Sequence, residues 1–225
     1  MITFKEFLDE MAAPTASIMK KVYYHGTAFE KAGLAILKRG IEPGDLATPE
    51  KYTGMKNLVP VSGKVYITPS LHYAQIYAIG GDFAGEEEPI ELNGQEFGYL
   101  FSINGSDLVD VQPDEDSVGE MVMKELNIPG KNPVISRVAD IVSTTLSARD
   151  LKKLKYGEYG MYAHAGKKVM SKLSDSEKIE LIAAGAHIAH HGKLIPSGAW
   201  KIDLIHIENL KRDGSNFFDY AEKIK

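Results

Sequence analysis

The chain has 225 residues, 44% of them hydrophobic, which is enough for one well-packed core with a short N-terminal appendage. It contains no cysteine, so disulfides and thiolate metal sites are excluded, and no apolar run reaches the length of about 18 residues that a membrane-spanning helix needs. The formal net charge of −5 argues against electrostatic binding of nucleic acid by the whole surface, although a local basic patch can still bind a nucleic acid.

The N-terminus is predicted to form a short amphipathic helix that is separable from the body. Phe4, Phe7 and Leu8 recur at helical spacing, and a small, proline-containing break follows. The apolar segment is too short and too charged for a secretory signal. We therefore expect residues 1–14 to be an appendage and 15–225 to be one domain. The alternative is an ordinary N-terminal helix that packs on the body.

In the first half of the body, short strands alternate with short helices. Gly40 ends the first helix, Ser70 caps the second, and a polar loop punctuated by Gly and Pro separates them. We expect strands at 21–25, 64–68 and 96–103, helices at 29–38 and 70–79, and the loop at 43–63.

The second half is predicted to be mainly helical, with a late strand. Acidic residues open one helix, and a capping box at Ser174 and Glu177 opens another. Alternation of residue types after Trp200 indicates a strand with at least one buried face. We expect helices ending near Leu126, at 134–146 and from 174 to about 190, and a strand at 200–207.

The motif that best carries chemistry is Tyr24-His25-Gly26-Thr27, followed by Val65-Tyr66-Ile67-Thr68 and, eleven positions after Tyr66, by Tyr77. Two tyrosine rings can sandwich a flat aromatic amide such as nicotinamide. A backbone N–H and C=O beside Gly26, which has no side chain, can hold the carboxamide. The ordered set predicts a nicotinamide slot, whereas His25 taken alone would be read as a strand histidine with a satisfied hydrogen bond.

This set, together with the run 35–43 and Ala74, resembles the NAD-binding half of the ADP-ribosyltransferases of the His-Tyr-Glu class, which includes diphtheria toxin and poly-ADP-ribose polymerases. The resemblance covers residues 22–80. It implies an α+β fold of the ADP-ribosyltransferase type, with a split, mainly antiparallel sheet and peripheral helices. It implies NAD as the substrate, His25 on its ribose, and the tyrosines on its nicotinamide. The implied NAD-binding residues are His25, Gly26, Thr27, Tyr66 and Tyr77.

Two positions compete for the third signature residue, a glutamate. Cleavage of the bond between nicotinamide and ribose develops positive charge, so a carboxylate near the ribose hydroxyls is needed. The stretch around Glu158 resembles the Glu-Tyr-x-x-Tyr stretch of the polymerase subgroup, whereas Ala199, directly before Trp200, better matches the family's glutamate strand. We favour position 199. The chain then either lacks full transferase chemistry naturally or is an inactivated variant. The candidate catalytic positions are His25, Tyr66, Ala199 and Glu158.

The N-terminus also resembles the capsid-targeting peptide that T4-like phages place on internal head proteins, including injected ADP-ribosyltransferases. The triplet Leu8-Asp9-Glu10 is similar to the site that the phage protease cuts. This resemblance implies a phage-encoded virion protein, delivered to or expressed in the bacterial cytoplasm. Its acceptor would be an unknown host protein or nucleic acid.

Three other activities remain open: an NAD glycohydrolase, an NAD-dependent RNA 2′-phosphotransferase, and a non-catalytic NAD-binding phage internal protein. The phosphotransferases also begin with a histidine followed by glycine, but this chain has Arg39 and then no arginine until Arg137. The non-catalytic protein is the natural reading of an alanine at position 199.

Two further clusters carry weaker hypotheses. His187, His190 and His191 share the predicted helix, where two of them could bind a metal, but without an accompanying carboxylate or cysteine motif we expect no metal site. A group of lysines concentrates positive charge in an acidic chain and is either a solvated face or a surface for an acidic macromolecule or RNA. Its members are Lys152, Lys153, Lys155, Lys167, Lys168 and Lys172.

Overall fold

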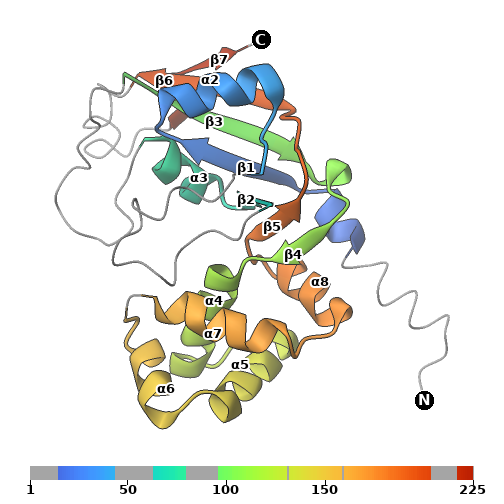
Figure 1. The fold of residues 1–225 in the computed structure, drawn as a ribbon, viewed down its shortest axis with the longest axis vertical. Coiled ribbons are helices and arrows are strands. Elements are labelled where there is room, and N and C mark those ends of the chain that lie inside the picture. Colours follow the sequence, from blue (N-terminus) through green and yellow to red (C-terminus); the bar gives the residue numbers. More distant parts are fainter. Residues whose placement is uncertain are drawn as a thin grey trace. The chain divides into compact units, whose positions relative to one another are not determined.

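The computed structural model describes residues 15–43, 63–79, 96–130, 132–158, 160–203 and 217–224. They form an α+β protein with mainly antiparallel sheets and peripheral helices, as the sequence predicts (Figure 1). The chain divides into two compact units, each assembled from segments distant in sequence. The helical unit comprises the described residues within Met1–Met19, Pro43–Tyr66 and Val109–His191. The sheet unit comprises those within Lys20–Glu42, Ile67–Leu108 and Gly192–Lys225.

The sheet unit is built on a four-stranded antiparallel sheet with the strand order β1-β3-β6-β7 (Figure 1). Its strands are β1 Val22–Thr27, β3 Phe97–Asn104, β6 Gly198–Asp203 and β7 Ala221–Ile224. Two helices, α2 Glu30–Arg39 and α3 Leu71–Ala78, pack against this sheet. The strands and helices expected in the first half of the chain are therefore confirmed to within a few residues.

Local signals set the ends of both helices. The Ser70 hydroxyl accepts the backbone N–H of Tyr73 at 3.3 Å and so caps the start of α3. Helix α2 ends at Gly40, whose φ of +87° lies in the region that favours glycine. The sequence predicted both boundaries because each depends on a single residue.

Two glycines let the helices approach the sheet from opposite sides. A Cβ on Gly26 of β1 would overlap the carbonyl oxygen of Ala74 in α3, and a Cβ on Gly33 of α2 would overlap the ring of Tyr99. Gly26 is paired with Leu100, the neighbour of Tyr99 in β3. Because successive residues of a strand point to opposite faces, α3 covers one face of the sheet and α2 covers the other.

The helical unit contains five labelled helices and a three-stranded sheet with the order β2-β5-β4 (Figure 1). The helices are α4 Glu115–Asn127, α5 Pro133–Thr145, α6 Ala148–Lys155, α7 Met161–Met170 and α8 Asp175–Ala183. The strands are β2 Lys64–Ile67, of which the last residue falls in the sheet unit, β4 Val111–Pro113 and β5 Ile188–His191. The expected helices near 126 and at 134–146 are confirmed.

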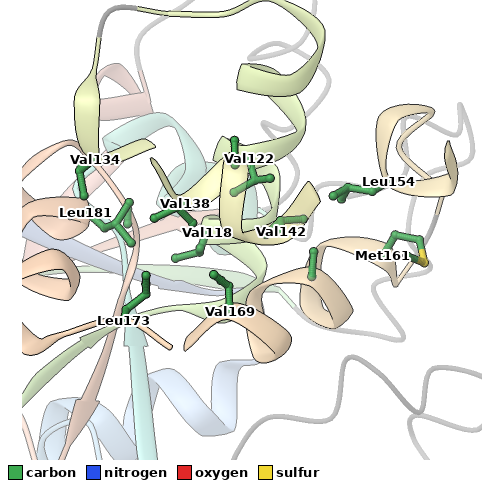
Figure 2. Packing of buried hydrophobic residues seen from close by; sticks show 13 residues of the cluster. Val118, Val122, Val134, Val138, Val142, Leu154, Met161, Val169, Leu173 and Leu181 are labelled. Atoms are coloured by element: carbon green, nitrogen blue, oxygen red, sulfur yellow. The ribbon is translucent and has the colours of Figure 1, made fainter. Parts of the chain in front are cut away.

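Branched aliphatic side chains fill the core between these helices. Figure 2 shows Val118, Val138 and Val142 in the middle of this core, with Leu181 to one side. Helices α4 and α7 cross with their backbones in contact, because a Cβ on Gly119 would overlap the carbonyl group of Tyr162. The side chains thus pack densely around a crossing that glycine permits.

One sequence prediction about this unit is wrong. The capping box at Ser174 and Glu177 opens α8, but the helix ends at Ala183 and does not reach His190. Gly185, with a φ of +113°, follows the last turn, and residues 188–191 form the strand β5. His190 is buried there, in the central strand of a three-stranded sheet. The three histidines therefore do not share a helix.

Several predicted segments lie outside the described residues, namely the appendage at 1–14, most of the loop at 43–63 and the end of the strand expected at 200–207. Within the described part of the chain, no helix combines the length and the apolar character needed to cross a bilayer.

Candidate functional site

One cross-strand row of the four-stranded sheet contains two of the predicted site positions. His25 of β1 pairs with Phe101 of β3, and Phe101 pairs in turn with Ala199 of β6. Directly paired residues of antiparallel strands project from the same face, so the side chains of His25 and Ala199 share a face. Their Cα atoms lie roughly 10 Å apart, because neighbouring strands are about 4.8 Å apart.

This shared face is the one that α2 covers. Phe101 stacks on Tyr99 with ring centroids 6.3 Å apart, and Tyr99 is the ring against which Gly33 packs. Phe101 is fully buried, His25 is half-buried, and Ala199 is 8% exposed. Position 199 therefore contributes a methyl group, and no carboxylate, to the row that begins at His25.

The outer edge of β1 offers backbone hydrogen-bonding groups. Tyr24 donates its N–H to the carbonyl of Thr68 at 2.8 Å and accepts the N–H of Thr68 at 2.9 Å. Backbone groups alternate in direction along a strand, so the N–H and C=O of Gly26 point to the same side as those of Tyr24, away from β3. A flat carboxamide at this edge can accept one hydrogen bond and donate another.

Helix α3 brings an exposed aromatic residue close to this edge. Its backbone packs on Gly26, since a Cβ there would lie 2.7 Å from the backbone nitrogen of Ala78. Tyr77, directly before Ala78, has a side chain that is 45% exposed. The packing of α3 on β1 therefore brings Gly26 close to the stretch of helix backbone that carries Tyr77.

Thr27 has a structural contact of its own. Its hydroxyl accepts the backbone N–H of Phe29 at 3.2 Å, in the turn that leads into α2, and the residue is buried. Thr68 makes the corresponding contact with the N–H of Ser70 at 3.0 Å, before α3. Each threonine hydroxyl therefore sets the start of a helix beside the predicted site.

The remaining two predicted positions belong to the helical unit and are described with it. Tyr66 is half-buried in β2. Glu158 lies in the turn between α6 and α7, where its carboxylate is 3.0 Å from the Lys153 ammonium and its side chain is 51% exposed. Position 199 lies on a strand of the sheet, which is where the family resemblance expects the glutamate, whereas Glu158 lies in a turn.

Outside the predicted site, the best-marked titratable group is Asp114. Burial raises the pKa of Asp114 to about 7, and the neighbouring carboxylates of Asp116 and Glu115 raise it as well. Asp114 is the N-cap of α4 and accepts the backbone N–H of Asp116. Its role is to begin a helix, so we assign it no catalytic part.

Metal chemistry has no candidate centre in the described residues, where no three His, Asp or Glu side chains gather closely enough to hold an ion. Comparison of the chain with models of known protein families and with curated protein sequences finds no match. The arguments for function therefore rest on this chain's own residues and their geometry.

Proposed function

We propose that the chain is an NAD-dependent ADP-ribosyltransferase whose NAD-binding slot lies at the outer edge of β1. One observation carries the proposal. The N–H and C=O groups of Gly26 point away from β3, and α3, which packs on the same glycine, has Tyr77 exposed. Hydrogen-bonding groups at a strand edge and an accessible aromatic ring beside them are what a nicotinamide carboxamide and its ring need.

In the proposed reaction, the bond between the nicotinamide nitrogen and the ribose C1′ breaks, and its electron pair leaves with nicotinamide. A nucleophilic atom of a host macromolecule then bonds to C1′ and releases a proton. His25 holds a ribose hydroxyl, while Gly26 and Tyr77 hold the leaving group. The phage origin inferred from residues 1–10 remains part of this proposal.

Ala199 supports a second candidate function, a non-catalytic NAD-binding protein. A carboxylate that faces the nascent cation separates catalysis from binding. The row from His25 to position 199 ends in a methyl group, so the chain as it stands is proposed to bind NAD and to cleave it slowly.

The binding step is tested by calorimetry with NAD and with nicotinamide. Tyr77→Ala is expected to weaken binding by about 1 to 3 kcal/mol, the contribution of a lost stacking platform. Tyr77→Phe is the matched control, because it keeps the ring, and it should leave NAD affinity within about twofold of the parent. Equal affinities in all three proteins, or none in any, would contradict the slot.

The chemical step is tested by restoring a carboxylate. Ala199→Glu should raise nicotinamide release by about a hundredfold or more, since one group placed on transition-state charge contributes about 3 to 4 kcal/mol. Mass spectrometry of host extract incubated with labelled NAD then identifies the acceptor. Release without labelling would favour the glycohydrolase.

Glu158→Gln in the Ala199→Glu background distinguishes the two glutamate positions. The Glu158 carboxylate is half-exposed and paired with Lys153, so its loss should change neither NAD cleavage nor, by more than about 0.5 kcal/mol, the stability. If the unmodified chain is already active and Glu158→Gln abolishes its activity, the carboxylate has been placed on the wrong segment.

A further inference from the structure

The helical unit has an open surface pocket of about 360 Å³ where the end of α4 meets α6. We call it the α6 pocket, and its lining residues are Asn127, Ala148, Leu151, Lys152, Lys155 and Tyr156. Figure 1 shows α6 at one end of the helical unit. The pocket shares no residue with the predicted NAD slot, so an inference drawn from it stands or falls independently of the transferase.

Tyr156 is an exposed ring on a fixed backbone. Its side chain is 76% exposed. Tyr156 directly follows α6, in which Leu154 is fully buried. The backbone N–H of Tyr156 is bonded to the carbonyl of Lys152 at 3.1 Å, which holds the residue in place. Such a ring is a ready platform for stacking a flat aromatic group.

Uncompensated positive charge borders this ring. Helix α6 carries four basic residues and one acidic residue, Asp150, whose carboxylate accepts the Ser147 hydroxyl at 2.8 Å. Lys153 is paired with Glu158, but Lys152 and Lys155 are exposed and form no ion pair with any described residue. The helix dipole favours lysines in this last turn, yet it leaves both charges available to an anion.

Lys152 also interacts with the ring directly. Its ammonium nitrogen lies 5.9 Å from the centroid of Tyr156, within the range of a cation–π contact. One cation therefore already lies over one face of the Tyr156 ring, so a base stacks on the opposite face or displaces this ammonium.

Asn127 adds a polar group of known orientation. Its amide nitrogen donates to the carbonyl oxygen of Lys155 at 2.9 Å, which ties the end of α4 to the end of α6. Because that partner is an acceptor, the atom facing it must be the nitrogen, and the amide oxygen is the remaining acceptor. Ala148 and Leu151 supply apolar lining.

We propose that the α6 pocket binds single-stranded nucleic acid, with one base stacked on Tyr156 and the adjoining phosphates on Lys152 and Lys155. The Asn127 amide oxygen accepts a hydrogen bond from the base edge. An acidic peptide would engage the lysines but would gain little from a bare aromatic face. A duplex keeps its base faces stacked inside, so a single strand is the form that fits.

The test is fluorescence anisotropy with a labelled RNA oligonucleotide of about twelve nucleotides, titrated with the whole chain. Tyr156→Ala should weaken binding about 5- to 100-fold, whereas Tyr156→Phe keeps the ring and should stay within about twofold of the parent. Phe29→Ala, which removes an exposed aromatic ring of the sheet unit, is the matched control and should have no effect.

A salt titration tests the two lysines. Joint replacement Lys152→Gln and Lys155→Gln should reduce the slope of log affinity against log salt by about 1.4, since each phosphate contact to a single strand contributes about 0.7. The control is Lys38→Gln with Lys168→Gln, two exposed lysines outside the pocket, and its slope should equal that of the parent.

Three results would overturn the proposal. The first is no detectable RNA binding by the parent chain at low salt. The second is equal RNA binding by the parent and by Tyr156→Ala, because this result would show that no base stacks on Tyr156. The third is that a polyglutamate peptide binds as tightly as the RNA and that Tyr156→Ala does not change its affinity. This result would make the pocket a site for acidic peptides. Thermal melting of each variant checks that the fold is retained.

Discussion

Among the described residues, the helical unit buries a cluster of thirteen side chains, most of them valine, leucine and alanine (Figure 2). In the sheet unit, Ala74 and Ala78 of α3 pack against Leu100 and Ile202 of the sheet, and Tyr99 and Phe101 lie on the opposite face. Its helices approach the sheet through glycines. The helical unit is thus packed mainly from aliphatic side chains, whereas the sheet unit combines buried aromatic rings, Tyr23, Tyr99 and Phe101, with glycine contacts and keeps Tyr77 at the surface.

The largest effect should come from removing volume in the helical unit. Leu181 is fully buried, so Leu181→Ala leaves a cavity and should lower the free energy of unfolding by about 3 to 4 kcal/mol. Urea denaturation followed by circular dichroism measures this change. Ile128→Ala is the control, because Ile128 is 82% exposed and its truncation should matter by less than about 0.5 kcal/mol. Similar losses in both variants would argue against the described core.

A smaller effect is expected when volume is added to the sheet unit. Gly33→Ala places a methyl group on the Tyr99 ring and should destabilise the protein by about 1 to 3 kcal/mol. Helix propensity alone predicts the opposite sign, a gain of about 1 kcal/mol, so the sign of the change tests the contact. Lys31→Ala, an exposed position on the same helix, serves as the reference in the same denaturation experiment.

The smallest effect concerns charge in the helical unit and depends on pH. The folded pKa of Asp114, about 7, lies above its ordinary value of 3.8, so the folded state keeps a proton that the unfolded chain releases between about pH 4 and 7. Stability therefore falls as pH rises through this window. Asp114→Asn keeps a good helix cap and removes the charge. The variant should match the parent at about pH 4 and become more stable than the parent as the pH rises through this window to about 8.

Stability measured against pH for both proteins checks the Asp114 prediction. Burial lowers the pKa of His187, which destabilises the fold as pH falls below about 6.5, but this group is common to both proteins. The difference between the two curves therefore isolates Asp114. A difference that does not change from pH 4 to 8 would show that this carboxyl titrates normally.

The parts of the fold that the sequence predicted have local causes. Ser70 and the Ser174 capping box each bond to a backbone N–H three residues away, so their helices could be located without knowledge of the rest of the chain. The missed elements depend on tertiary partners. Strand β5 pairs with β4, which is distant in sequence. Helix α7 begins after Gly160, and this glycine has a left-handed backbone conformation. A local sequence pattern shows neither the partner with which a strand pairs nor the sign of a residue's φ angle.

The candidate site divides in the same way. The sequence singled out His25, Gly26 and Tyr77 by residue type and spacing, and it placed Ala199 directly before a strand. It could not show that His25 and Ala199 share a row, because register depends on β3, which lies between their strands. Alternation of Phe97, Tyr99 and Phe101 was the available signal for that face.

The interleaved chain path has a consequence for synthesis on the ribosome. Most of the helical unit, from Val109 to His191, is one continuous stretch with many short-range helical contacts, so it can begin to fold as soon as it emerges. The four-stranded sheet cannot be completed until β7 has been made, because β1 and β7 lie near opposite ends of the chain. During translation, β1 can pair with β3 early, whereas β3 must wait for its second partner, β6, while the helices are already forming.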